Sequence, residues 1–152
     1  MRLSPAVYRS HSLAAIGVAC HEAGHAIQHS TGFAPLHLRT ALVPATNASS
    51  WLSYIVIMLG FLFSSQQFIL LGALIFSAAV LFSLITLPVE WDAGWRAKKL
   101  MVSTGIVSSK ESVYAAKVLN AAFLTYVAAT VSSVLTLLYY LMRAGIFGGG
   151  ND

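Results

Sequence analysis

Three uncharged apolar stretches divide the chain. Residues 51–63 form the first stretch, and a break of serines and glutamines at 64–67 separates it from a second stretch over 68–87. A third stretch covers 121–142. Because a helix of about 20 residues crosses a bilayer core of about 30 Å, the second and third stretches predict membrane-spanning helices. The first stretch reaches that length only when residues 47–50 are included.

The pattern as a whole predicts an all-α membrane protein with a single domain over residues 1–152. We expect a helix over 10–30, a transmembrane hairpin over 48–87, a polar helix over 88–104 and a helix over 109–143 that includes the third span. The ten-residue alternation of apolar and polar positions that marks the strands of a membrane barrel is absent from the sequence.

Composition narrows the class of protein further. Hydrophobic residues make up 57% of the chain and charged residues only 9%, whereas soluble domains carry roughly 25% charged residues. The lipid bilayer is therefore the expected partner. The net charge is +4, but no basic run is longer than Lys98-Lys99, so we expect no nucleic-acid partner. Cys20 is the single cysteine and cannot form a disulfide within the chain.

The distribution of basic residues predicts the orientation. A hairpin over 48–87 places residues 1–47 and 88–120 on one side of the membrane, and only Arg143 among the lysines and arginines lies on the other. By the positive-inside rule both polar segments face the cytoplasm, in a multi-pass protein of the cell inner (plasma) membrane. The glycines at 148–150 predict a flexible end.

The motif His21-Glu22-Ala23-Gly24-His25 carries the candidate chemistry. On a helix, His21 and His25 lie one turn apart, so both imidazoles can bind one zinc ion. Glu22 can then act as general base toward a zinc-activated water. Ser10 or Ser12 can cap this helix. The alternative is a pair of histidines that only form hydrogen bonds in a protein core.

A catalytic zinc needs a third protein ligand. His29 lies about 12 Å along the helix axis from His21, too far for both to bind one ion. Thr31 occupies the position of the third histidine in the metzincin pattern. His37 is expected in a loop flanked by prolines and stays open as a candidate.

Glu90 is the favoured third ligand. It follows the second span directly, close to Pro88, which favours a helix start or a kink. A carboxylate at the edge of a span is costly without a partner, and a zinc ion is such a partner. Asp92 stays open between three roles: a ligand, a partner that orients a zinc-bound imidazole, or an ion pair with Arg96 at the i,i+4 spacing.

Three segments carry a resemblance to a known family: HEAGHAIQHSTGFAPLHLRTALVP, TLPVEWDAGWRA and KVLNAAFLTYVAA. They resemble the membrane neutral zinc metallopeptidases often called YugP-like, over nearly the whole chain. The resemblance implies a cytoplasm-facing zinc peptidase of the gluzincin type, with Zn²⁺ as cofactor and a peptide or membrane-protein substrate. By the motif match His21, His25 and Glu90 are the metal ligands and Glu22 is the catalytic base.

The chain departs from the family pattern at two places. Family members usually carry a further N-terminal membrane helix, whereas Met1 here directly precedes Arg2-Leu3-Ser4, so we expect a shortened form. Many gluzincins place an aspartate four residues after the glutamate ligand, where this chain has Gly94. The alternative function is a non-catalytic membrane metal-binding scaffold or a truncated pseudoenzyme.

A stripe of small residues recurs every four positions in the third span. It allows helices to pack closely, either within the chain or between copies in a homo-oligomer. The stripe consists of Ala121, Thr125, Ala129 and Ser133.

Overall fold

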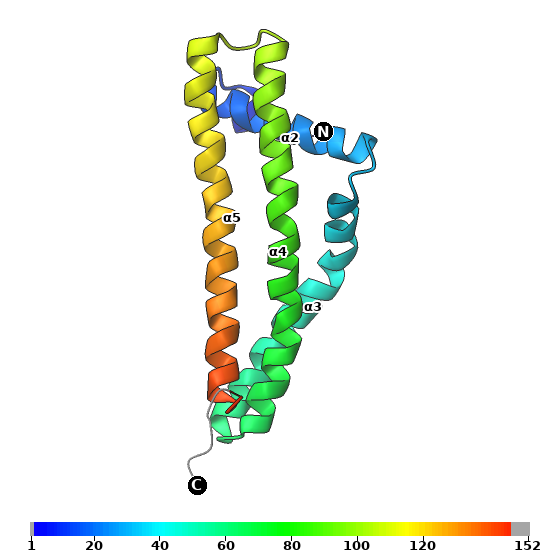
Figure 1. Ribbon diagram of the computed structural model, residues 1–152, viewed down its shortest axis with the longest axis vertical. Coiled ribbons are helices and arrows are strands. Elements are labelled where there is room, and N and C mark those ends of the chain that lie inside the picture. Colours follow the sequence, from blue (N-terminus) through cyan, green and yellow to red (C-terminus); the bar gives the residue numbers. More distant parts are fainter. Residues whose placement is uncertain (1, 147–152) are drawn as a thin grey trace. The chain divides into compact units, whose positions relative to one another are not determined.

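The structure is a computed structural model that describes residues 2–146, and the glycines at 148–150 lie outside the described residues. Within the described part the chain forms helices and no strand, which confirms the all-α prediction (Figure 1). The helices, in chain order, are α1 (Pro5–Tyr8), α2 (Leu13–Ser30), α3 (Ala34–Leu62), α4 (Gln66–Ser103) and α5 (Ser109–Arg143).

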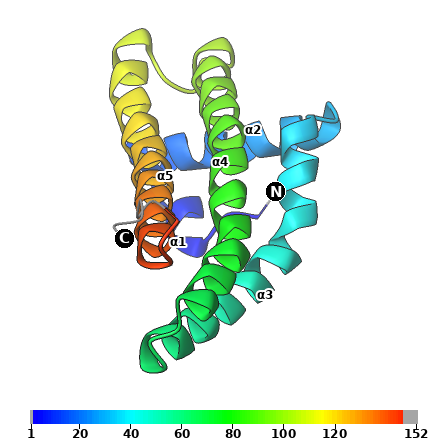
Figure 2. The ribbon, with the colours of Figure 1, turned by 60° about the horizontal axis from the view of Figure 1, so that its bottom comes forward.

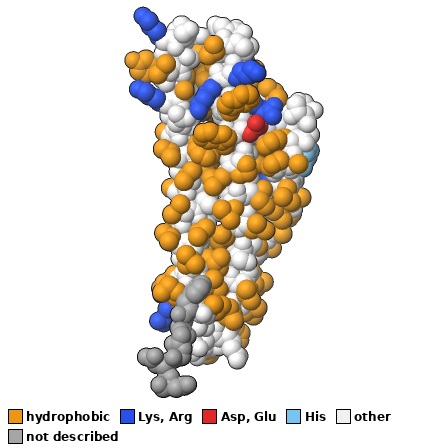
Figure 3. All heavy atoms as spheres, in the orientation of Figure 1, with side chains coloured by type: hydrophobic (Ala, Val, Ile, Leu, Met, Phe, Trp, Pro, Cys, Tyr) orange, Lys and Arg blue, Asp and Glu red, His pale blue; other side chains and the backbone are white. Residues whose placement is uncertain are grey.

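The three expected spans are confirmed as long apolar helices. By length and composition α3, α4 and α5 can each cross a membrane. Large apolar side chains on these helices are exposed, such as Leu74 at 59% and Leu124 at 62%, and hydrophobic side chains cover much of the visible surface (Figure 3). Apolar residues that face outward in this way are typical of helices surrounded by lipid.

Two expectations about proline were wrong. His37 was expected in a loop flanked by prolines, but α3 begins at Ala34 and continues through Pro44. Pro35 is tolerated because the first turn of a helix needs no N–H from it. Of the two alternatives at Pro88, the helix start is wrong, because α4 runs continuously from the second span into the segment expected as a separate helix over 88–104, and the kink stays a prediction. Neighbouring helices can support a proline in a membrane helix, which sequence periodicity does not reveal.

The described chain divides into two compact units. The first contains the residues up to Leu38 together with Thr86–Val127, and the second contains Arg39–Ile85 together with the described residues from Ala128 on. In the second unit α3 and α4 form the close hairpin predicted from the sequence. A Cβ atom on Gly72 would collide with the side chain of Ile57, so a residue without a side chain is needed there.

In the second unit, the small-residue stripe of α5 packs against α4 of the same chain. The Oγ atoms of Ser133 on α5 and Ser83 on α4 lie 3.1 Å apart and share a hydrogen bond. Thr130, one turn away, donates a hydrogen bond to the carbonyl oxygen of Ser83. These contacts favour packing within the chain as the role of this part of the stripe.

The first unit is organised by α2, which crosses α4 and α5 (Figure 2). Ser12 is the N-cap of α2, because its hydroxyl accepts a hydrogen bond from the amide of Ala15 at 3.2 Å. Ser108 and Glu111 form a capping box at the start of α5. The core of the unit lies between α2, α4 and α5 and consists of Cys20, Ala97, Met101, Val107, Ala115 and Leu119.

Candidate metal centre

The face of α2 that carries the two motif histidines lies directly against α4. Gly24, within the motif, is buried, and a Cβ atom on it would lie 2.5 Å from the carbonyl oxygen of Ala93. No larger residue allows this approach between the two backbones. Ala93 stands three residues after Glu90, so the contact at Gly24 brings the turn of α4 that carries Glu90 up to His21 and His25.

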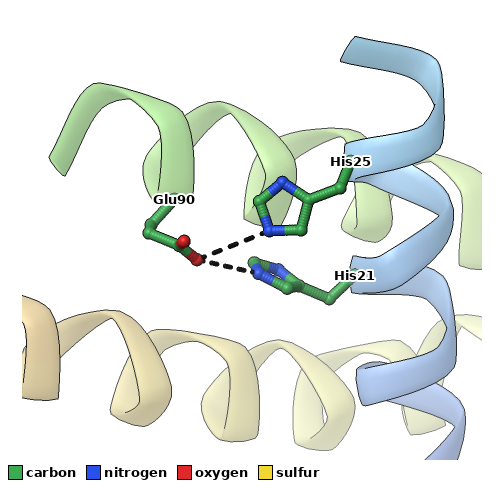
Figure 4. A group of neighbouring side chains, drawn as sticks. All are labelled: His21, His25 and Glu90. Carbon is green, nitrogen blue, oxygen red and sulfur yellow. Dashed lines mark hydrogen bonds and ion pairs between the residues drawn. The ribbon is translucent and has the colours of Figure 1, made fainter. Parts of the chain in front are cut away.

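The carboxylate of Glu90 faces both imidazoles (Figure 4). Its Oε2 atom is 3.1 Å from Nε2 of His21 and 3.6 Å from Nε2 of His25. The rings of the two histidines meet edge to face, with their centroids 4.8 Å apart. One ligand atom from each of these three residues lies within 4.8 Å of the others. The structure therefore brings together the three residues that the sequence singled out.

This donor set fits zinc. Two imidazoles and one carboxylate are a ligand set of catalytic zinc sites, which leave a further position open for water. The Glu90 side chain is only 2% exposed, and a buried carboxylate needs a cationic partner. The Nδ1 atom of His21 is buried and has no hydrogen-bond partner among the described residues.

The charge of Glu90 acts on the neighbouring imidazole. The pKa of His25 is raised above its ordinary value, first by its hydrogen bond to Glu90 and then by its hydrogen bond to Gln28 and the charges of Glu90 and Glu22, although burial opposes the change. The site thus attracts a positive charge between Glu90 and the histidines, whether that charge is a proton or a metal ion.

Gln28 belongs to the surroundings of the site, and the sequence analysis missed it. Its side chain is completely buried, and its Oε1 atom lies 2.8 Å from Nδ1 of His25. Its Nε2 atom donates hydrogen bonds to the carbonyl oxygen of Val89 and to Oδ2 of Asp92, both at 2.8 Å. The available signal was its position three residues after His25, on the same side of the helix.

The structure shows which of the three roles considered for Asp92 its contacts support. Oδ2 of Asp92 accepts a hydrogen bond from Nε of Arg96 at 2.6 Å, the ion pair expected from the i,i+4 spacing. The same oxygen accepts the hydrogen bond from Gln28. Asp92 is not part of the three-residue group that can hold a metal, so its link to the site runs through Gln28.

The remaining candidates lie outside the ligand group. His29 and His37 contact each other edge to face, with ring centroids 5.7 Å apart. Neither belongs to the group of His21, His25 and Glu90. Glu22 is partly buried on α2, and its charge reaches His25.

Comparisons with known proteins show the family to which the chain is similar. Residues 1–145 match the protein family described as "Putative neutral zinc metallopeptidase". The chain is 45% identical over all 152 residues to "Putative membrane protease YugP" of Bacillus subtilis (strain 168) and covers 66% of the length of that protein. No solved structure matches the chain.

Proposed function

This chain belongs to the neutral zinc metallopeptidase family, and we propose that it is an integral-membrane zinc metallopeptidase that hydrolyses peptide bonds. The observation that carries the proposal is the meeting of His21 and His25 from α2 with the buried Glu90 from α4. The name of the Bacillus relative, a membrane protease, supports the same activity. The chain spans 66% of that relative's length, so the activity and the substrates of the relative remain part of the proposal.

His21, His25 and Glu90 would hold the zinc ion. When bound there, zinc supplies Lewis-acid activation of a water molecule and of the peptide carbonyl group. Glu22 would take the proton of the attacking water and pass it to the leaving amine. Such general acid–base catalysis typically contributes about 10²–10⁴-fold to the rate. The position of Glu22 supports this role, since it stands between the two histidines in the sequence and lies outside the ligand group.

The site would face the cytoplasm from the inner membrane. Every lysine and arginine except Arg143 lies in residues 1–47 or 88–120, the segments that also carry the site. Lysine and arginine side chains gather over the first-unit ends of α4 and α5 (Figure 3). The positive-inside rule assigns this side to the cytoplasm. A membrane protein or a peptide at the membrane surface is the proposed substrate class.

We also propose that residues 1–152 form a single domain. Each of the helices α3, α4 and α5 continues without a break from one compact unit into the other. Units joined by continuous helices differ from domains joined by exposed linkers, which is the usual form of a domain boundary.

The test is a comparison of zinc content and peptidase activity in detergent. We expect about one zinc ion per chain and cleavage of a mixture of fluorogenic peptides. Glu22→Gln should keep the zinc and lose turnover, whereas Glu111→Gln, a matched change at an exposed carboxylate, should keep both. Zinc without turnover in the parent chain would favour the metal-binding scaffold. Absence of zinc from the parent chain would overturn the proposed site.

A further inference from the structure

We propose that Gln28 is a positioning residue that holds His25 as the tautomer with its proton on Nδ1, so that the lone pair of Nε2 faces Glu90. A role of Gln28 in zinc binding rests on the zinc site of the proposed function. Its structural part concerns hydrogen bonds of the metal-free chain and can be tested without zinc.

The orientation of the Gln28 amide is fixed by its partners. Its Nε2 atom lies 2.8 Å from two oxygens, the backbone carbonyl of Val89 and Oδ2 of Asp92. An amide nitrogen has two protons and can donate to both, whereas a flipped amide would place its own oxygen against these two acceptors. The oxygen of Gln28 must therefore point toward His25, and the assignment follows from the network.

The orientation of the amide in turn fixes the proton of His25. The Oε1 atom of Gln28 can only accept a hydrogen bond, so Nδ1 of His25, 2.8 Å away, is the donor. A neutral imidazole has one N–H. The competing contact, from Nε2 of His25 to Oε2 of Glu90, is longer at 3.6 Å. The shorter bond keeps the proton on Nδ1 and leaves Nε2 unprotonated, the form in which an imidazole nitrogen binds a metal.

The network behind Gln28 is itself held in place. Gln28 and Val89 are completely buried, and Asp92 is anchored by Arg96 at 2.6 Å. Hydrogen bonds that point away from a metal fix the ring orientation of its ligands, and losing one typically weakens metal binding about 10–100-fold. Of the two motif histidines, His25 has such a hydrogen bond, whereas Nδ1 of His21 has no partner among the described residues.

The first measurement is the tautomer of His25 in the metal-free parent chain. We would record ¹⁵N NMR of chain labelled at histidine, in detergent, at an alkaline pH where the imidazoles are neutral, and assign His25 with a His25→Asn variant. We expect a protonated Nδ1 and an unprotonated Nε2. A proton on Nε2 of His25 would overturn the proposal without any substitution of Gln28, so the result does not depend on a variant folding.

The second measurement compares zinc affinity by competition with a chelator. Gln28→Leu removes both ends of the amide network at similar size, and we expect about 10–100-fold weaker zinc binding together with a mixed tautomer of His25. Val107→Ala, which alters the core of the same unit, should lower thermal stability and leave the zinc affinity and the tautomer unchanged. An unchanged tautomer and affinity in Gln28→Leu would overturn the proposal. Failure of the parent to bind zinc would instead contradict the proposed function. The tautomer of His25 in the metal-free chain would still test whether Gln28 positions that imidazole.

Discussion

Gly24 on α2 lies against the backbone of Ala93 on α4, at a distance that leaves no room for a side chain. The HExxH pattern itself does not require a glycine between its histidines. Here the glycine sets the separation of α2 and α4, and that separation places Glu90 within 3.6 Å of both imidazoles. The contact thus connects the packing of the first unit to the geometry of the candidate metal centre.

Gly24→Ala should therefore weaken the metal site. The added Cβ atom would lie 2.5 Å from the carbonyl oxygen of Ala93, so the two backbones must move apart. Overpacking of this kind costs about 1–3 kcal/mol of stability. We expect a lower melting temperature and zinc binding weakened on the order of tenfold, measured by chelator competition.

Gly17→Ala is the matched control on the same helix. Its Cβ atom would meet its nearest neighbour, the carbonyl oxygen of Ala115, at an ordinary contact distance of 3.7 Å. Alanine is about 1 kcal/mol more favourable than glycine in a helix, so this variant should keep its zinc affinity and melt no lower than the parent. Equal effects of the two substitutions would contradict the proposed role of the Gly24 contact.

Asp92→Asn should leave zinc binding within a few-fold of the parent. The asparagine oxygen can still accept hydrogen bonds from Gln28 and Arg96, so the network toward His25 survives the loss of charge. Glu90→Gln should abolish tight binding, because it removes the carboxylate that faces both imidazoles. Zinc content by atomic absorption checks both variants. Loss of zinc in Asp92→Asn and its retention in Glu90→Gln would make Asp92 the third ligand.

The sequence singled out the three residues that the structure brings together, but it did not indicate their surroundings. The spacing of His21 and His25 places both side chains on one face of a helix, and a carboxylate directly after a span has few partners, so Glu90 could be chosen without a structure. Gln28 could not be chosen in this way. Its function depends on Val89 and Asp92, which stand more than sixty residues away and become neighbours only through packing.

The helix boundaries around prolines could not be predicted for a related reason. Three spans followed from length and hydropathy alone. Pro44 and Pro88, however, lie inside α3 and α4, although proline usually ends or kinks a helix. Packing against neighbouring helices can offset the backbone hydrogen bond that a proline removes, and the sequence does not reveal that packing.

The capping box at the start of α5 should fail in acid. The carboxylate of Glu111 accepts hydrogen bonds from the amide and the hydroxyl of Ser108, and these bonds lower its pKa below the ordinary value of 4.5. A carboxyl group with a lowered pKa in the folded chain stabilises it above the unfolded pKa, and this contribution is lost as the pH falls through the folded value. Hydrogen exchange of the Ser108 amide, corrected for intrinsic rate, should therefore accelerate in that range. In Glu111→Ala the Ser108 amide should exchange faster than in the parent at neutral pH, and the two exchange rates should converge in acid. Parallel pH profiles of the two rates would contradict the prediction.

Removal of zinc should lower the melting temperature of the parent chain. A ligand that binds only the folded state stabilises it by about 2.7 kcal/mol at a concentration a hundredfold above its dissociation constant. We expect a chelator to reverse this stabilisation in the parent and in His29→Ala, since His29 contacts His37 and lies outside the ligand group. His21→Ala should melt at the same temperature with and without zinc, because one of its three ligands is missing. Differential scanning fluorimetry in detergent measures all three chains, and a zinc-dependent shift that persists in His21→Ala would place the ion elsewhere in the molecule.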